Sequence, residues 1–322
     1  MKEVRHGLSR RQLGYVAAGA AVGLASSHSF AAGPSHRIAY ANLSDENSFS
    51  ALVLGGFKTE AAKRPGIEMG YFDNKGDAAK AVENARIIAT SKFDLLIEYS
   101  GNPGANVQIG RIMKEAGIPS IAITTPIEGA PLFAVDNVEA GRVSGRRLAE
   151  TAKAKWPDAT PVAVISGFPE FGATIAERGD WAKKGISGIY PGIAFEEFSN
   201  KNDSGLTRQV ATDMLTRFPN RKIIFWATVD AIALACVAAI RNANREADAL
   251  VSTTGGDKAS IPEIRRPGTP YVGTYAFFPE LWAQDLLDAA EKMLRKEQVP
   301  PRIIPKNQAF LDARNINQYY PG

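Results

Sequence analysis

The hydrophobic pattern of the chain alternates, from residue 37 onward, between short apolar runs and longer amphipathic segments. The short runs are rich in β-branched and aromatic residues, which is typical of β-strands. They span 37–43, 67–73, 93–100, 119–124, 132–136, 161–166, 193–199, 221–226, 249–253 and 271–276. Strands that alternate with helices of ordinary length indicate βαβ units and parallel sheets.

The amphipathic segments repeat apolar residues at the spacing of one helix face. They cover 50–64, 77–91, 104–116, 137–155, 172–189, 205–217, 229–243 and 280–296. Two successive strand–helix series predict an α/β fold class with two doubly wound parallel-sheet lobes. Each lobe is expected to present ligand-facing loops at the carboxyl ends of its strands.

The chain is expected to pass between the two lobes three times, at a three-segment hinge. The first crossing is predicted at 135–142, where Asn137 is the expected N-cap of the following helix. The second is predicted near residue 277, and the third at the VPP break of residues 299–301. The predicted lobes are 36–135 plus 277–300, and 136–276 plus 301–322. Parallel hinge segments suit two lobes that close on a molecule between them.

Residues 1–31 have the pattern of an export signal. Paired arginines in SRRQLG (9–14) precede a weakly apolar, Ala/Gly-rich stretch (15–25), as they do in twin-arginine signals. The small residues Ser29 and Ala31 predict cleavage after Ala31 and therefore a periplasmic location. An uncleaved membrane anchor is the alternative, although the apolar run is shorter than the ~20 residues of a membrane span.

The net charge of +4 does not indicate a nucleic-acid partner. Lys2, Arg5, Arg10 and Arg11 are opposed only by Glu3 within residues 1–31, so the rest of the chain is close to neutral. Nucleic-acid-binding domains, in contrast, are strongly basic.

The supply of histidine and cysteine excludes several kinds of site. The three histidines, His6, His28 and His36, all precede the first predicted strand. The folded body therefore lacks the base of Ser-His-Asp and Cys-His catalysis and the ligands of His/Cys zinc sites, although carboxylate or lysine chemistry stays possible. The single cysteine, Cys236, lies in an apolar segment and is expected to be a buried hydrophobe. We expect no metal and no cofactor.

Several stretches share the order and spacing of motifs in a known family. They are SDENSF (44–49), EAGIPSIAI (115–123), VDNVEAGR (135–142), ERGD (177–180) and VGTYAFFPE (272–280). Together they make residues 37–322 resemble the periplasmic sugar-binding proteins of the ribose-binding type, which are ABC-transporter solute-binding proteins with the type I periplasmic-binding-protein fold. The resemblance implies a monomeric, non-catalytic receptor that captures a small sugar-like ligand by hinge closure and delivers it to an ABC permease in the inner membrane.

The expected ligand-binding residues come from the carboxyl ends of strands and from positions that match the family. Asp45 and Asn47 can hydrogen-bond hydroxyls, and Phe49 can cover an apolar sugar face. The alternative is that this loop only forms a turn and caps the next helix. Arg178 stands where the family uses an arginine to fork onto ligand hydroxyls, or it pairs with a neighbouring acid. The full set is Asp45, Asn47, Phe49, Thr124, Thr125, Asp136, Arg178, Thr228, Asp230, Thr254, Asp257 and Phe277. For Asp136 a structural role is the alternative, and for Asp257 it is helix capping.

Some of these positions depart from the ribose-type pattern. Thr124 and Thr125 replace the family's Asp-Arg pair, Thr254 replaces a later aspartate, and Phe277 replaces a hinge glutamine. A less charged cleft favours a ligand with more apolar surface or fewer hydroxyls. Nearby Trp282 is in register with the apolar face of the last long helix, so it is expected to lie in the core.

Two other functions stay open on the sequence alone. A sensor of the same fold would present its closed form to a chemoreceptor or a sensor kinase, and only surface residues would differ from those of a transport protein. A carboxylate-dependent glycosidase that uses Asp45 or Glu46 is the enzymatic alternative. We expect a binding protein and not an enzyme.

Overall fold

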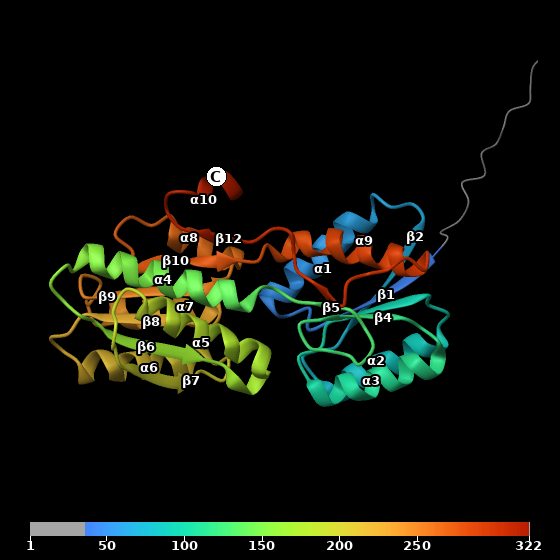
Figure 1. Ribbon diagram of the computed structural model, residues 1–322, viewed down its shortest axis with the longest axis horizontal. Helices are drawn as coiled ribbons and strands as arrows, with labels where there is room; N and C mark the ends of the chain where they lie inside the picture. Colours follow the sequence, from blue (N-terminus) through green and yellow to red (C-terminus); the bar gives the residue numbers. More distant parts are fainter. Residues whose placement is uncertain (1–35, 322) are drawn as a thin grey trace, which may run out of the picture. The chain divides into compact units, whose positions relative to one another are not determined.

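The computed structural model describes residues 36–321. The predicted export signal, residues 1–31, lies outside the described residues. Within the described part, the chain forms two six-stranded sheets with helices packed on both faces (Figure 1). This confirms the predicted α/β class with two parallel-sheet lobes.

The first lobe has a wholly parallel sheet with the strand order β11-β5-β4-β3-β1-β2. Its strands are β1 (His36–Asn42), β2 (Ile67–Asp73), β3 (Leu95–Glu98), β4 (Ser120–Ile123), β5 (Leu132–Phe133) and β11 (Arg302–Ile303). Its helices are α1 (Ser48–Ala61), α2 (Ala78–Thr90), α3 (Pro103–Ala116), the 3₁₀ turn η3 (Pro279–Leu281) and α9 (Trp282–Leu294).

The second lobe has the strand order β12-β10-β9-β8-β6-β7, in which only β12 runs antiparallel to its neighbour. Its strands are β6 (Val162–Gly167), β7 (Phe195–Ser199), β8 (Ile223–Ala227), β9 (Ala249–Gly255), β10 (Tyr271–Ala276) and β12 (Ala309–Leu311). Its helices are α4 (Asn137–Lys155), η1 (Pro169–Phe171), α5 (Ala173–Ser187), α6 (Ser204–Arg217), α7 (Asp230–Asn242), η2 (Lys258–Ser260), α8 (Ile261–Ile264) and α10 (Ile316–Tyr319).

The central strands β3, β4, β8 and β9 are buried along their whole length. This burial explains the nearly continuous apolar runs of β3, β4 and β8. In β1, Ile38 and Tyr40 belong to the core under α1 and α9, whereas Ala39 and Ala41 belong to the core under α2 and α3. Figure 1 shows these two helix pairs on opposite sides of the first sheet. In the second lobe α4 and α5 cover one face and α6 and α7 the other. Cys236 is fully buried on α7, as predicted.

The chain crosses between the two sheets three times, and the third crossing differs from the prediction. Arg302 and Ile303 form β11, which pairs with β5 at the edge of the first sheet. These residues therefore belong to the first lobe and not to a second-lobe segment that starts at 301. The connection to β12 runs through residues 304–308. Sequence patterning missed β11 because a two-residue edge strand has no alternation to recognise.

The start of α4 also corrects a prediction. Asp136 and not Asn137 is the N-cap, since its Oδ1 accepts a hydrogen bond of 2.9 Å from the Glu139 N–H. The Asn137 side chain is buried, and its Oδ1 accepts a 2.5 Å hydrogen bond from Arg178 Nε on α5. Asp136 therefore has the structural role that was its alternative, and Asn137 holds Arg178 instead of capping the helix.

Helices α4 and α5 approach each other at backbone contact because glycine removes the side chains between them. A Cβ atom at Gly141 would lie 2.2 Å from the Arg178 carbonyl oxygen, and one at Gly145 would lie 2.3 Å from the Ala182 carbonyl oxygen. This close packing fixes the position of Arg178 relative to the start of α4.

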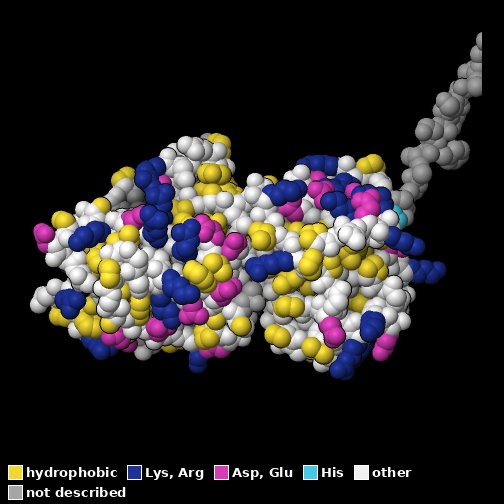
Figure 2. All heavy atoms as spheres, viewed as in Figure 1, with side chains coloured by type: hydrophobic (Ala, Val, Ile, Leu, Met, Phe, Trp, Pro, Cys, Tyr) yellow, Lys and Arg dark blue, Asp and Glu magenta, His cyan; other side chains and the backbone are white. Residues whose placement is uncertain are grey.

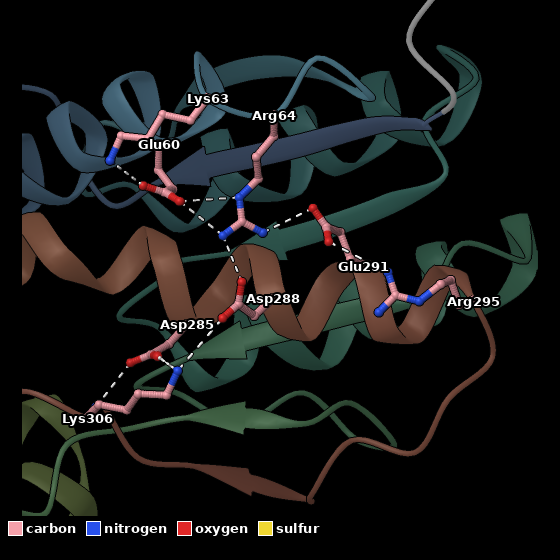
Figure 3. Close-up of polar contacts among 8 residues, drawn as sticks. All are labelled: Glu60, Lys63, Arg64, Asp285, Asp288, Glu291, Arg295 and Lys306. Carbon is pink, nitrogen blue, oxygen red and sulfur yellow. Dashed lines mark hydrogen bonds and ion pairs between the residues drawn. The ribbon is translucent and has the colours of Figure 1, made fainter.

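Ion pairs join the third crossing to the first lobe (Figure 3). Arg64, just after α1, pairs with Asp288 and Glu291 of α9. Lys306 of the third crossing pairs with Asp285 at 2.8 Å, and its main-chain N–H donates to the other Asp285 oxygen at 3.0 Å. Asp285 is buried. Helix α9 therefore holds the third crossing through both the main chain and the side chain of Lys306.

The described residues contain no candidate membrane span, and one face of the molecule carries both signs of charge. Among residues 36–321, no helix combines the length and the apolar character that crossing a membrane requires. On the face drawn in Figure 2, basic and acidic side chains are interspersed over both lobes.

Candidate functional site

Loops at the carboxyl ends of the strands of both sheets enclose a cavity of about 160 Å³. The strand order reverses at β1/β3 in the first sheet and at β6/β8 in the second, and doubly wound sheets bind ligands at such points. The first lobe contributes Leu43 after β1 and Tyr99 after β3, and the second contributes Phe168 after β6 and Val229 after β8. The cavity is therefore placed where the fold puts a binding site.

The predicted residues divide into those that line this cavity and those that do not. The lining residues are Asn47, Phe49, Thr124, Arg178, Asp230, Asp257 and Phe277. The residues outside the lining are Asp45, Thr125, Asp136, Thr228 and Thr254.

Trp282, at the start of α9, organises the apolar wall of the cavity. Its ring centroid lies 5.3 Å from that of Phe49, in an edge-on arrangement, and 6.3 Å from that of Tyr99. Its Nε1–H donates a 2.8 Å hydrogen bond to the Phe277 carbonyl oxygen. Trp282 is 3% exposed and belongs to the first-lobe core, as predicted, but it also lines the cavity.

Arg178 supplies the cationic group of the cavity. Its guanidinium carbon lies 4.7 Å from the centroid of the Phe277 ring, a cation–π distance. Its Nε donates to Asn137 Oδ1 at 2.5 Å and its Nη1 to Thr254 Oγ1 at 3.3 Å. The side chain is almost fully buried, and burial lowers the pKa of Arg178 to about 10, although the charges of Tyr99 and Asp230 act in the opposite direction.

Asp230 lines the cavity, but both of its carboxylate oxygens already accept hydrogen bonds from the protein. Oδ1 accepts from the Tyr271 hydroxyl at 2.9 Å, and Oδ2 accepts from the N–H groups of Gly256 at 2.8 Å and Asp257 at 3.1 Å. Burial raises the pKa of Asp230 above its usual value. Asp230 thereby fixes the loop after β9. Within the described range, no group of three or more acidic, histidine or cysteine side chains is arranged to hold a metal ion.

Asn47 and Asp257 each cap a helix and also line the cavity. The Asn47 side chain accepts from the Ser50 N–H at 3.0 Å as the N-cap of α1. Asp257 Oδ1 accepts from the Ala259 N–H at 3.0 Å, and Oδ2 accepts from the Ser48 hydroxyl. The bond between Ser48 and Asp257 connects the two lobes beside the cavity.

The polar residues outside the lining hold the surrounding backbone. Asp45 is exposed and accepts from Asn42 Nδ2 at 2.8 Å, which orders the loop after β1. Asp136 caps α4. Thr125 is buried, and its carbonyl oxygen accepts from Asn106 at 2.7 Å.

Two of the predicted threonines tie strand ends together in the second lobe. The Thr228 hydroxyl donates to the Ser166 carbonyl oxygen at 2.8 Å, between β8 and β6. The Thr254 hydroxyl donates to the Thr228 carbonyl oxygen at 2.7 Å while it accepts from Arg178. Thr254 is thus a positioning residue for Arg178.

Sequence reasoning missed several lining residues, including Tyr99, Phe168, Ile175 and Asn202. Tyr99 directly follows β3 and Phe168 directly follows β6. Asp45 and Asn47 are predicted because they follow the first strand. The same rule, applied to β3 and β6 at the points where the strand order reverses, would have found Tyr99 and Phe168.

A buried carboxyl group lies next to the cavity, one residue before Tyr99. Glu98 is 0% exposed, Oε1 accepts from Asn74 Nδ2 at 2.8 Å, and Oε2 has no hydrogen-bond partner among the described residues. Burial raises the pKa of Glu98 to about 8, although the hydrogen bond from Asn74 acts in the opposite direction.

Comparison with known proteins identifies the family of the chain and finds solved structures of the same fold. A family model described as periplasmic binding protein domain matches residues 38–298. No curated protein sequence matches the chain. Solved structures of similar fold include an ABC transporter periplasmic solute-binding protein from Actinobacillus succinogenes with bound D-allose, at 22% identity and a TM-score of 0.77 over 88% of this chain and 100% of that one. A solute-binding protein from Bacillus halodurans with bound myo-inositol has 18% identity and a TM-score of 0.75, over 89% of this chain and 97% of that one. A 5-methylthioribose transporter solute-binding protein from Thermotoga lettingae has 17% identity and a TM-score of 0.73, over 88% of each chain.

Proposed function

The chain belongs to the periplasmic binding protein domain family, and we propose that it captures a small sugar-like ligand between its two lobes by hinge closure and delivers it to an ABC permease in the inner membrane. It would act in the periplasm, as a monomer, and without catalysis. The residues proposed to contact the ligand are Asn47, Phe49, Thr124, Arg178, Asp230, Asp257 and Phe277.

The observation that carries the proposal is the composition of the cavity. Aromatic rings from the first lobe and hydrogen-bonding groups from both lobes line one space at the carboxyl ends of the strands. Aromatic faces cover the C–H face of a sugar ring, while amide, hydroxyl and guanidinium groups bind its oxygens. Because each lobe contributes only part of the lining, closure of the lobes would complete the site.

The ligands of structurally similar proteins support a sugar-like molecule. D-allose, myo-inositol and 5-methylthioribose are bound to proteins of this fold. The first two have only hydroxyl substituents, whereas the third has an apolar methylthio group. The aromatic wall around Trp282 and Phe277 favours the third kind of ligand, which agrees with the loss of charged residues at Thr124 and Thr254.

A thermal-shift screen tests the proposal. A ligand present at 100 times its Kd stabilises the folded state by ~2.7 kcal/mol. At about 2–4 °C per kcal/mol for a chain of this size, we expect a rise in Tm of about 5–10 °C. The panel would contain D-allose, myo-inositol and 5-methylthioribose, with the Arg217→Ala surface variant, which should respond like the parent, as the control. If no sugar, polyol or glycoside raises Tm and no small molecule co-purifies, the proposal is wrong.

Phe277→Gln is expected to shift ligand preference toward molecules with more hydroxyl groups. The substitution removes the ring that lines the cavity and faces the Arg178 guanidinium, and it adds a donor and an acceptor. We expect the ratio of affinities for 5-methylthioribose and D-allose to fall about tenfold, which corresponds to ~1.4 kcal/mol. Phe277→Leu is the matched control because it removes the ring without adding hydrogen-bonding groups. Titration calorimetry measures both affinities, and an unchanged ratio in Phe277→Gln would assign Phe277 to the core alone.

A further inference from the structure

Arg178 carries a buried guanidinium that forms no direct ion pair with a carboxylate of the described residues, although the charges of Tyr99 and Asp230 act on it from a distance. Arg178 is only 7% exposed. Two of the five N–H groups of an arginine donate to neutral oxygens here, those of Asn137 and Thr254. The remaining N–H groups have no acceptor in the described part of the chain. A buried charge without a partner is costly, so this group is suited to binding an anionic or strongly accepting ligand atom.

The two acidic residues of the cavity do not serve as that partner. Asp230 uses both oxygens to accept from Tyr271, Gly256 and Asp257. Asp257 uses its oxygens to accept from Ala259 and Ser48. Neither carboxylate forms a hydrogen bond or an ion pair with Arg178 among the described residues, so a ligand can supply the acceptor for its remaining N–H groups.

Apart from the oxygens of Asn137 and Thr254 that accept from it, Arg178 is close to an aromatic ring and to hydroxyl groups of the cavity. The Phe277 ring lies against the guanidinium at 4.7 Å. Thr124 and Tyr99 also line the cavity, and each has a hydroxyl group that can donate a hydrogen bond. A charge-assisted pair between guanidinium and carboxylate is about twice as strong as a neutral hydrogen bond, and the planar guanidinium fits the two oxygens of a carboxylate.

The rest of the cavity limits the body of the ligand. Its volume of about 160 Å³ is close to the ~150 Å³ of a cavity that admits one benzene ring. Phe49, Trp282, Ile175 and Phe168 present apolar surface to it. The space therefore suits a single ring with an apolar face.

We propose that the ligand is a small cyclic carboxylic acid, whose carboxylate binds the free N–H groups of Arg178 while its ring packs against Phe49 and Trp282. This inference rests on the proposed function, since it names the ligand class of the same site. A sugar acid and an aromatic acid both carry a carboxylate on a ring. The experiment below distinguishes these two kinds of ligand.

The test compares acids with their neutral counterparts. Titration calorimetry and thermal shift would use D-glucuronate against D-glucose, D-galacturonate against D-galactose, and benzoate against benzyl alcohol. We expect at least one acid to bind ten times or more tightly than its neutral partner. A sugar acid as the better ligand would support both the ligand class and the proposed sugar-like ligand. Benzoate as the better ligand would support the carboxylate and would contradict the sugar-like ligand.

Arg178 variants identify the group that recognises the acid. In Arg178→Gln the acid should bind at least 30 times more weakly than in the parent, so that its advantage over the neutral partner is lost. Arg178→Lys keeps the charge and should retain part of that advantage, which a purely structural role would not produce. Far-UV circular dichroism and Tm of the free variants show whether each is folded, and Arg178→Lys serves as the second variant if Arg178→Gln does not fold.

The results that would overturn the inference are distinguishable. If neutral sugars bind as tightly as the acids or more tightly, the carboxylate assignment is wrong while the proposed function stands. If no acid raises Tm but a neutral compound of either panel does, the ligand class is wrong and the proposed function stands; if no compound of either panel raises Tm and no small molecule co-purifies, both fail.

Discussion

Replacement of Trp282 by alanine is expected to lower the free energy of unfolding by about 3–5 kcal/mol and to abolish ligand binding. The indole is 3% exposed and packs edge-on against Phe49 at 5.3 Å and Phe133 at 5.2 Å. Its removal leaves a void at the start of α9 and a Phe277 carbonyl oxygen without its 2.8 Å partner. Urea unfolding followed by circular dichroism measures the loss of stability, and calorimetry measures the loss of binding.

Trp282→Phe is the matched control for this prediction. It keeps an aromatic ring but removes the Nε1–H donor, so it should cost about 1–3 kcal/mol from the smaller ring and the unpaired carbonyl oxygen of Phe277. A loss of less than 1 kcal/mol in Trp282→Ala would mean that neighbouring side chains refill the space. In that case Trp282 would not be the residue that holds the aromatic wall in place.

Replacement of Glu98 by glutamine is expected to flatten the pH dependence of stability between about pH 5 and pH 8. Burial raises the folded-state pKa of Glu98 from its ordinary value of 4.5 to about 8. Between these values the folded state keeps a proton that the unfolded state has released. The stability that protonated Glu98 contributes is therefore fully present below pH 4.5. It falls as the pH rises toward 8, by about 1.4 kcal/mol for each pH unit.

Urea unfolding at several pH values checks this prediction. The parent should lose stability steadily from pH 5 to pH 8, and Glu98→Gln should be the more stable of the two proteins at pH 8. Asn74→Ala is an informative comparison because it removes the hydrogen bond that lowers the pKa of Glu98, so the decline should persist. Carboxylates with lowered pKa values, such as Glu60 and Asp248, affect stability only below this window. Parallel pH profiles for the parent and Glu98→Gln would show that Glu98 is charged in the folded protein.

Much of the fold was predictable from local pattern. The predicted strands 67–73 and 271–276 and the helix 137–155 coincide with β2, β10 and α4. Strands of a sheet that is covered on both faces read as short apolar runs, and a helix that is buried on one face repeats apolar residues at helical spacing. Short elements were missed for the same reason. The strands β11 and β12 and the helix α10 have four residues or fewer, which is too few for a period to be visible.

The candidate site was less predictable, and Asp136 and Asn137 show why. Both are good helix-capping residues, and nothing in the local sequence says which one caps. The choice depends on Arg178, which is brought to the start of α4 by the glycine-mediated contact of α4 with α5. Tyr99 and Trp282 likewise line the cavity only because β3 and α9 come together in the tertiary structure.

The sequence by itself determined the α/β class, the two lobes and the ends of strands at which a ligand would bind, because these follow from short-range periodicity and from the residue types that strands and helices require. Only the tertiary structure decided which polar groups of the cavity form hydrogen bonds within the protein and which can bind a ligand. Asp230 and Arg178 both line the cavity, yet the carboxylate has its hydrogen-bond partners, whereas some N–H groups of the guanidinium have no acceptor among the described residues. That distinction depends on contacts between residues far apart in the chain, and such contacts leave no mark on local sequence pattern.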